Sequence, residues 1–286
     1  MSLELEFGAD GTRRFRFRPT LVRPSTDGIF ASDSVIRRVF GDAACLFGAG
    51  TALLLQLAHP SIGRAVYEHS DYANRPLDRL FGTIYATSAV VFGSRDDARR
   101  IGDEVRAMHA RVTGSGYRAS DPELVCWVNA TLLGTAVQMY ERIVAPLPPA
   151  ELDELVFDAR RVGEVFGCPL DAQPSAWRAF ESYWDTTVAS LTVTECARRV
   201  AWSLLEREGL PLRPAWATPV AVSRAITAAT LPARIRDDYR LPWDRRAQTT
   251  AKFVLGAAGT VMPRLPGRLR RLTPELLGSP GNPGLG

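Results

Sequence analysis

The chain has 286 residues, of which 46% are hydrophobic, and its formal net charge at pH 7 is +4. This length and apolar content suffice for one large domain or two small ones with a sizeable core. The weak charge, and basic residues that are not interleaved with stacking aromatic side chains, argue against a nucleic-acid-binding protein. Lys252 is the only lysine, which excludes most lysine chemistry, such as Schiff bases and P-loops.

The cysteines form no C-x-x-C motif and have no histidine close enough for a zinc pattern. Cys45 and Cys126 lie in apolar helical runs, which indicates small core residues. The N-terminus lacks the apolar core of a signal peptide. The longest apolar run, 46–58, is broken by glycines and is too short to span a bilayer. We therefore expect a soluble, reduced, cytoplasmic protein without a transmembrane segment.

Residues 1–31 are predicted to form an N-terminal arm. Within it, residues 2–18 alternate apolar and charged side chains around a Gly-containing stretch, which indicates either a β-hairpin or a disordered arm. Residues 32–278 are predicted to form one helical domain, and the Gly/Pro-rich residues 279–286 a disordered tail. Because the pattern is helical throughout and shows no βαβ alternation, the predicted class is all-α.

The helical body begins with an apolar helix that ends at His59 and Pro60. Its G-A-G-T-A-L piece lacks the remaining features of a nucleotide-binding loop, so its glycines are expected to allow close helix packing or the approach of a flat ligand. A histidine at a helix C-terminus interacts favourably with the last carbonyl groups, which is the structural interpretation of His59. Residues 78–92 are predicted to form a further apolar helix, with Arg79 and Thr83 on one face.

The next predicted helix, 95–113, carries a buried stripe formed by Ile101, Val105, Met108 and Val112. His109 lies inside this stripe, with Arg106 one turn before it on the same side. A histidine in a core is either a hydrogen-bonded structural residue or a ligand to a metal or haem, since neutral imidazole is the commonest metal ligand. Spacing alone favours the structural interpretation.

Further helices are predicted at 121–143, 149–167, 175–191, 194–207, 218–230, 231–237 and 244–261. The stretch that follows the last helix, R-L-P-G-R-L-R-R-L, is basic. Contact with a membrane surface is one interpretation, and a terminal helix with a solvated tail is the preferred one.

The chain has only three histidines, His59, His69 and His109. It lacks the paired Glu-x-x-His motifs of a di-iron bundle and the G-x-S-x-G motif of a serine hydrolase. No cysteine stands in a glycine-flanked loop typical of thiolate-ligated haem enzymes. A histidine-ligated haem, which needs a buried imidazole, apolar helices and arginines for the propionates, agrees better with His109 and Arg106.

Five stretches in this order and spacing resemble the MpaB-like oxygenases, which share a catalytic domain with the latex-clearing protein, a rubber oxygenase. They are L-L-L-Q-L-A-H-P (53–60), E-H-S (68–70), R-L-F-G-T (79–83), V-R-A-M-H-A-R-V-T-G (105–114) and Y-R-A-S-D-P-E-L-V-C-W-V-N-A (117–130). The resemblance implies a globin-like helical domain with haem b. It also implies dioxygen as co-substrate and cleavage of a carbon–carbon double bond in an isoprenoid chain.

The resemblance also implies roles for individual residues. His109 in R-x-x-H matches the axial iron ligand, with Arg106 beside it, and Arg79 and Thr83 match residues near the haem. We further expect His59 to support the cofactor site and Glu68 to be a candidate base.

Two positions depart from the family pattern. Gly82 stands where rubber-cleaving members have a lysine that can cap the iron, so the iron is expected to be more open. Asn129 replaces a histidine of W-V-H-A, which puts in doubt the transfer of a cofactor-binding role to this position.

The function that these residues predict is oxidation of a small apolar isoprenoid or secondary metabolite by a haem-dependent oxygenase. Rubber is not the expected substrate, because no secretion signal is seen. Two alternatives stay open: a helical protein that binds an apolar ligand without redox chemistry, and a haem enzyme that oxidises without cleavage. The sequence predicts no oligomeric state.

Overall fold

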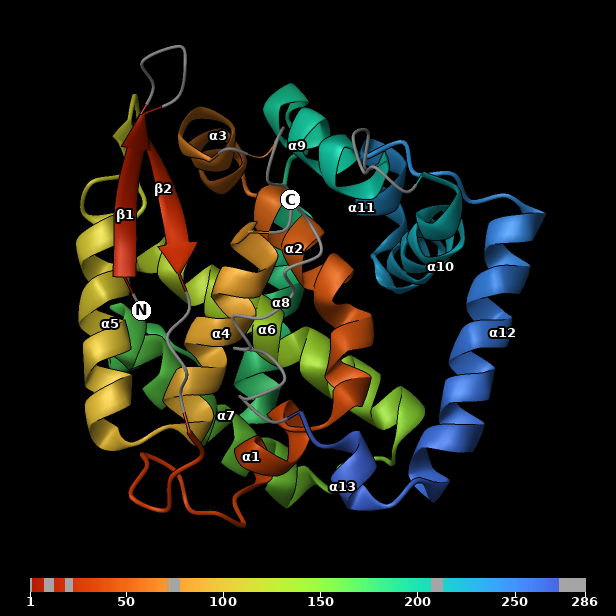
Figure 1. Ribbon diagram of the computed structural model, residues 1–286, viewed down its shortest axis with the longest axis horizontal. Helices are drawn as coiled ribbons and strands as arrows, with labels where there is room; N and C mark the ends of the chain where they lie inside the picture. The colour runs from red at the N-terminus through yellow and green to blue at the C-terminus, as the bar shows by residue number, and fades with distance from the viewer. Residues whose placement is uncertain are drawn as a thin grey trace.

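The computed structural model describes residues 2–7, 13–18, 23–70, 72, 78–206 and 213–272, and it describes the backbone alone at 2–7, 13–18, 78–80, 206 and 213–218. Within these residues the protein is a helical assembly with two small two-stranded sheets (Figure 1). The all-α prediction is confirmed. The predicted tail, 279–286, lies outside the described residues.

The N-terminal half contains β1 (Ser2–Phe7), β2 (Arg13–Arg18), α1 (Val35–Phe40), the 3-10 helix η1 (Ala43–Gly48), α2 (Ala49–Leu57), α3 (Pro60–His69), α4 (Asp78–Phe92), α5 (Arg95–His109), β3 (Thr113–Gly114), β4 (Tyr117–Arg118) and α6 (Pro122–Ile143). The C-terminal half contains α7 (Pro149–Phe166), η2 (Leu170–Ala172), α8 (Trp177–Ser190), α9 (Glu195–Glu206), α10 (Arg213–Thr230), α11 (Ala233–Asp238), α12 (Arg245–Val261), η3 (Met262–Arg264) and α13 (Gly267–Arg270).

The N-terminal arm contains an antiparallel hairpin, in which β1 pairs with β2 and Leu5 lies opposite Phe15. The hairpin interpretation of residues 2–18 is therefore confirmed for the two strands. β2 contacts α3 and α4, and in Figure 1 the hairpin lies across one end of the helical body.

Helix α5 begins and ends through local chemistry. Ser94 and Asp97 form a reciprocal capping box at its N-terminus, which satisfies backbone N–H groups that have no partner inside the helix. The helix ends at His109, so the predicted extension to residue 113 is wrong. Thr113 instead pairs with Arg118 in a tight hairpin that turns through Gly116 at a φ of +83°, a conformation that glycine adopts without strain.

Helix α6 runs through the core, and its Trp127 is fully buried. The indole of Trp127 bonds to a carbonyl group of α2 that is left free because the helix is interrupted at His59 and Pro60. The N–H of His59 bonds to the carbonyl of Gln56, which leaves the Leu55 carbonyl without its usual helical donor. The indole Nε1–H of Trp127 donates to that carbonyl at 3.0 Å.

Two glycines bring η1 and α2 close to other helices. A Cβ on Gly50 would lie 2.2 Å from the hydroxyl of Thr227 on α10, and one on Gly48 would lie 3.0 Å from Met139 on α6. The G-A-G-T-A-L piece therefore permits close helix packing, which is the first of the two uses that the sequence suggested.

One prediction about the cysteines is wrong. Cys126 on α6 and Cys168, just after α7, are joined in a disulfide with their Cα atoms 5.3 Å apart. Both residues are buried, as expected for Cys126, but they are not reduced thiols. Sequence spacing gave no sign of the pair, because 42 residues separate the two positions and only the packing of α7 on α6 brings them together.

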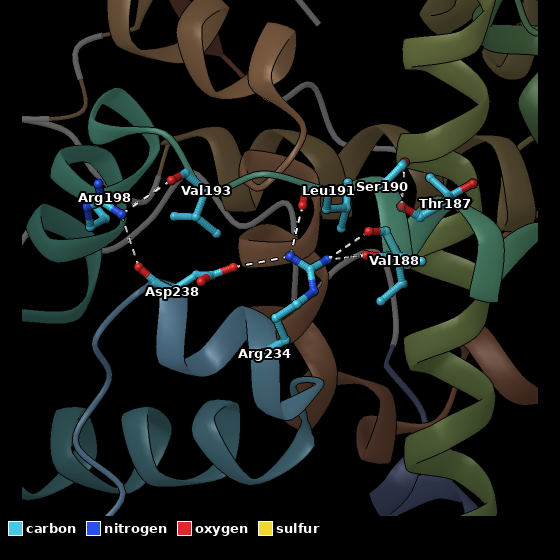
Figure 2. A network of polar contacts seen from close by, with 9 residues as sticks. Thr187, Val188, Ser190, Leu191, Val193, Arg198, Arg234 and Asp238 are labelled. Atoms are coloured by element: carbon cyan, nitrogen blue, oxygen red, sulfur yellow. Dashed lines mark hydrogen bonds and ion pairs between the residues drawn. The ribbon is translucent and has the colours of Figure 1, made fainter.

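Two arginines donate hydrogen bonds to backbone carbonyl groups where α8, α9 and α11 meet (Figure 2). The last carbonyl groups of a helix have no intrahelical donor, and the guanidinium of Arg234 donates to the carbonyls of Val188 at 2.6 Å and Leu191 at 3.0 Å. Arg198 donates to the carbonyls of Val193 and Asp238. These bonds fix the C-terminal end of α8 against α11.

Among the described residues, no single helix is both long and apolar enough to cross a membrane. The consecutive segments Ala43–Leu57 and Pro60–His69 together have the length and apolar composition of a membrane span, but the chain bends by 98° between them.

Candidate functional site

A pocket opens between the segment from α1 to α2, helix α4 and helix α6. Its empty volume of about 730 Å³ includes the space that is open to solvent at its mouth. It is lined by Phe40, Cys45, Leu46, Ala49, Ala52, Leu53, Gln56, Thr83, Ile84, Thr87, Ser88, Val91, Phe92, Leu132, Thr135, Ala136 and Leu272. None of these residues carries a formal charge at neutral pH, so the pocket suits a largely apolar, uncharged molecule.

Helix α4 separates this pocket from α5. One side of α4 lines the pocket, through Thr83, Ile84, Thr87, Ser88 and Val91, which recur with helical periodicity. The opposite side packs on α5, where Tyr85, Ala86 and Ala89 cluster with Ile101 and Val105. Thr83, which matches a residue near the haem in the family motif, therefore lines this pocket.

Thr87 lies at the centre of the α4 wall, and only 6% of it is exposed. Within the described part of the chain, neither its hydroxyl nor that of Ser88 forms a side-chain hydrogen bond. The facing polar groups are engaged, since Gln56 donates to Thr131 at 3.0 Å and Thr135 donates to the Thr131 carbonyl at 2.7 Å. An oxygen function on a ligand in the pocket could therefore form a hydrogen bond with the hydroxyl of Thr87.

His109 ends α5 at the same end of the α4–α5 pair as Thr83. Two residues join the other ends of these helices, and Figure 1 shows them running side by side. Val105, one turn before His109, packs on α4. The His109 side chain is half-buried and its Nδ1 atom is buried. His109 is not, however, among the residues that line the pocket.

Arg106 is directed toward α7. Its guanidinium donates to the carbonyl of Val165 and pairs with Asp103 at 2.6 Å. The arginine therefore connects α5 to the last turn of α7, and its predicted contact with a cofactor stays a prediction. Arg79 lies in the first turn of α4, but its side chain is outside the described residues.

Glu68 lies on α3, in a polar group at the surface. It pairs with Arg64 at 2.7 Å and accepts a hydrogen bond from the hydroxyl of Tyr117 at 2.5 Å. These two donors, the tyrosine first, lower the pKa of Glu68, and burial together with Glu68 raises the pKa of Tyr117. Glu68 is thus held ionised, and it does not line the pocket.

His59 precedes α3 at the N-cap position, next to Pro60. Its Nδ1 atom is buried and has no hydrogen-bond partner in the described part of the chain. Burial lowers the pKa of its imidazole, which favours the neutral form. His59 therefore has the chemistry of a ligand or a hydrogen-bonding group, although it is not part of the pocket wall.

Asn129 connects α6 with α7 and the segment that follows it. Its amide nitrogen donates to the carbonyl of Ala159 at 2.9 Å and to the Gln173 side chain at 3.2 Å. Gln173 in turn donates to the carbonyls of Arg160 and Cys168. In this structure Asn129 ties helices together, and a role toward a cofactor stays a prediction.

Residues 37–262 match the family model described as ER-bound oxygenase mpaB/B′/rubber oxygenase, catalytic domain. The chain belongs to this family. It is 26% identical over 212 residues to the uncharacterized protein Rv2237 of Mycobacterium tuberculosis and, equally, to the uncharacterized protein Mb2261 of Mycobacterium bovis. Each alignment covers 71% of this chain and 83% of the relative. No solved structure matches it.

The described residues of this mpaB/rubber-oxygenase domain contain no group of three or more His, Cys, Asp or Glu side chains arranged to hold a metal ion. His59, His69 and His109 accordingly do not form a three-histidine site.

Sequence reasoning missed Thr87 and Ser88. The signal that would have found them is the run A-T-S-A-V-V in an apolar helix, with Thr87 one turn after Thr83. Gln56 was missed because a single amide side chain in an apolar run was interpreted only as a break in that run. Only the fold shows that α2 and α4 face each other across a pocket.

Proposed function

We propose that this protein is a haem b-dependent oxygenase that oxidises an apolar isoprenoid or secondary metabolite by cleaving a carbon–carbon double bond. The family supplies the oxygenase class. The observation that carries the proposal is the uncharged pocket wall on α4, the helix whose opposite side packs on α5, which ends at His109.

The ligand donors of the chain fit a haem held by imidazole better than one held by thiolate. Three of the four cysteines are unsuited to bind iron, because Cys126 and Cys168 are bonded to each other and burial raises the pKa of Cys45 so far that its thiol stays protonated. His109 provides an imidazole at the end of a helix that is packed on α4. It would hold the iron, and the bound haem would supply the redox chemistry with dioxygen.

The pocket residues would select and orient the substrate. Apolar side chains such as Leu53, Leu132 and Val91 would hold a hydrocarbon chain and exclude water from it. Thr87 and Ser88 would bind one uncharged oxygen function, such as an alcohol or a carbonyl. A carboxylate or diphosphate would be disfavoured, because none of the described residues that line the pocket is a cation. We assign no proton transfer to Glu68, whose carboxylate is engaged with Arg64 and Tyr117.

The proposal is tested first by the absorption spectrum of the purified protein, combined with a pyridine-haemochrome assay. Near-stoichiometric haem b is expected in the wild type, and none is expected in His109→Ala, because the iron would lose its protein ligand. His69→Ala is the matched control, since this half-buried histidine contacts Tyr117 and is assigned no cofactor role. Full haem loading in folded His109→Ala protein would overturn the assignment.

The reaction is tested by oxygen uptake and product analysis. We expect oxygen consumption with neutral isoprenoid alcohols or ketones and carbonyl products shorter than the substrate. Products that keep the whole carbon chain would instead identify a haem enzyme that oxidises without cleavage.

A second candidate is a binding protein for an apolar ligand without redox chemistry. One observation favours it: no histidine lines the pocket. A colourless protein, expressed with ample haem, that still binds an isoprenoid would support this alternative and contradict the haem proposal.

A further inference from the structure

Helix α12 lies at the edge of the molecule and leaves one side open to solvent. Figure 1 shows it at the far side from α4 and α5. Its buried side is formed by Ala251, Leu255 and Ala258, and it packs on α10 and α6. Phe253 points away from these contacts and is 74% exposed, which is more than any other large apolar residue in the described part of the chain.

Two further large apolar side chains of residues 245–272 are exposed. Val261, two turns later, is 53% exposed, and Leu269 of α13 is 65% exposed. Between Phe253 and Val261 the outer side carries small residues, and a Cβ added to Gly256 would meet nothing within 4 Å. The helix can therefore lie flat against a surface along this side.

The same segment carries only positive charge. Residues 245–272 contain seven basic residues and no acidic one; the basic residues are Arg245, Arg246, Lys252, Arg264, Arg268, Arg270 and Arg271. Because the whole chain has a net charge of +4, the remainder has a net charge of −3. Arg270 pairs with Asp42 at 2.9 Å. In the described part of the chain the other six basic residues form no ion pair.

We propose that this surface binds the face of an anionic lipid bilayer. The α12–α13 face is defined here as Arg246, Lys252, Phe253, Val261, Arg264, Arg268 and Leu269. Exposed aromatic and aliphatic side chains beside unpaired cations are the two features that hold an amphipathic helix at a lipid surface. This inference does not depend on the proposed haem chemistry.

The charge pattern argues against a second copy of the chain as the occupant. A two-fold symmetric interface would place this face against itself and bring its four unpaired cations toward four others. The cations would instead be attracted by the negative surface potential of anionic lipids, while Phe253 inserts at the boundary between headgroups and acyl chains.

The test is co-sedimentation of the full chain with vesicles of phosphatidylcholine alone or mixed with phosphatidylglycerol. We expect affinity for the anionic vesicles to be at least about tenfold higher and to fall as salt is raised, because salt screens the attraction. Equal binding to both vesicles, or no binding to either, would overturn the proposal.

Two phenylalanine variants make the test specific. Phe253→Ala should weaken binding to anionic vesicles by about tenfold, since one buried aromatic side chain is lost from the bilayer contact. Phe157→Ala is the matched control, because Phe157 on α7 is 57% exposed but has Asp153 and Glu154 close to it in the helix. Equal losses in both variants, or a concentration-dependent dimer that Phe253→Ala abolishes, would contradict a lipid-binding role.

Discussion

Helix α6 is fixed to its neighbours on one side and borders the pocket on the other. On the side of α7, the disulfide from Cys126 and the amide of Asn129 fix the helix to its neighbours. On the side of the pocket, Leu132 and Ala136 face empty space, and across it the hydroxyls of Thr87 and Ser88 form no side-chain hydrogen bond in the described chain. The comparison indicates that the pocket borders a helix held in place by a disulfide and hydrogen bonds on its other side. Precise sites need such rigid support.

The largest expected effect on stability comes from removing the disulfide between Cys126 and Cys168. Cys126→Ser should lower the free energy of unfolding by about 4 kcal/mol, because a cross-link over 42 residues restricts the unfolded chain by that order of magnitude. Denaturant titration measures the loss. Cys196→Ser is the control and should change stability little, since Cys196 is a free, half-buried cysteine. Four free thiols in the unreduced wild type by alkylation would contradict the disulfide.

A smaller loss is expected at Asn129. Asn129→Ala removes two hydrogen bonds and leaves the Gln173 oxygen with one donor fewer, which should cost about 1–2 kcal/mol of stability. Ligand affinity in the pocket should stay unchanged, because Asn129 does not line it. Gln138→Ala, at an exposed position on the same helix, should cost clearly less. A variant that keeps its stability but loses ligand would place Asn129 in the binding site.

The smallest stability effect is expected in the pocket. Thr87→Val preserves the side-chain shape and removes a hydroxyl that has no side-chain partner, so stability should change by less than about 1 kcal/mol. Affinity for an isoprenoid alcohol should fall about fivefold to tenfold, while affinity for the matching hydrocarbon should not fall. Thr135→Val is the control, because its hydroxyl already donates to the Thr131 carbonyl. Equal losses for alcohol and hydrocarbon would contradict the polar contact.

The helices were predictable because their signals are local. Capping residues and prolines mark their ends, and the apolar stripe of α5 correctly predicted that Ile101 and Val105 are buried. Thr83 was found through the family motif. The direction of Arg106 was not predictable, because the carbonyl of Val165 that accepts from it lies 59 residues away. The disulfide and the pocket also depend on contacts between distant helices, which periodicity within one helix does not encode.

The corner at His59 and Pro60 also bears on how firmly the α2 wall of the pocket is held. Buried donors from two distant helices hold the end of α2, since Trp127 bonds to the Leu55 carbonyl and Tyr239 bonds to the Leu54 carbonyl at 2.8 Å. Displacing α2 would break both bonds, at about 1–3 kcal/mol for each buried group left unpaired. The α2 wall is therefore a firmly held side of the pocket.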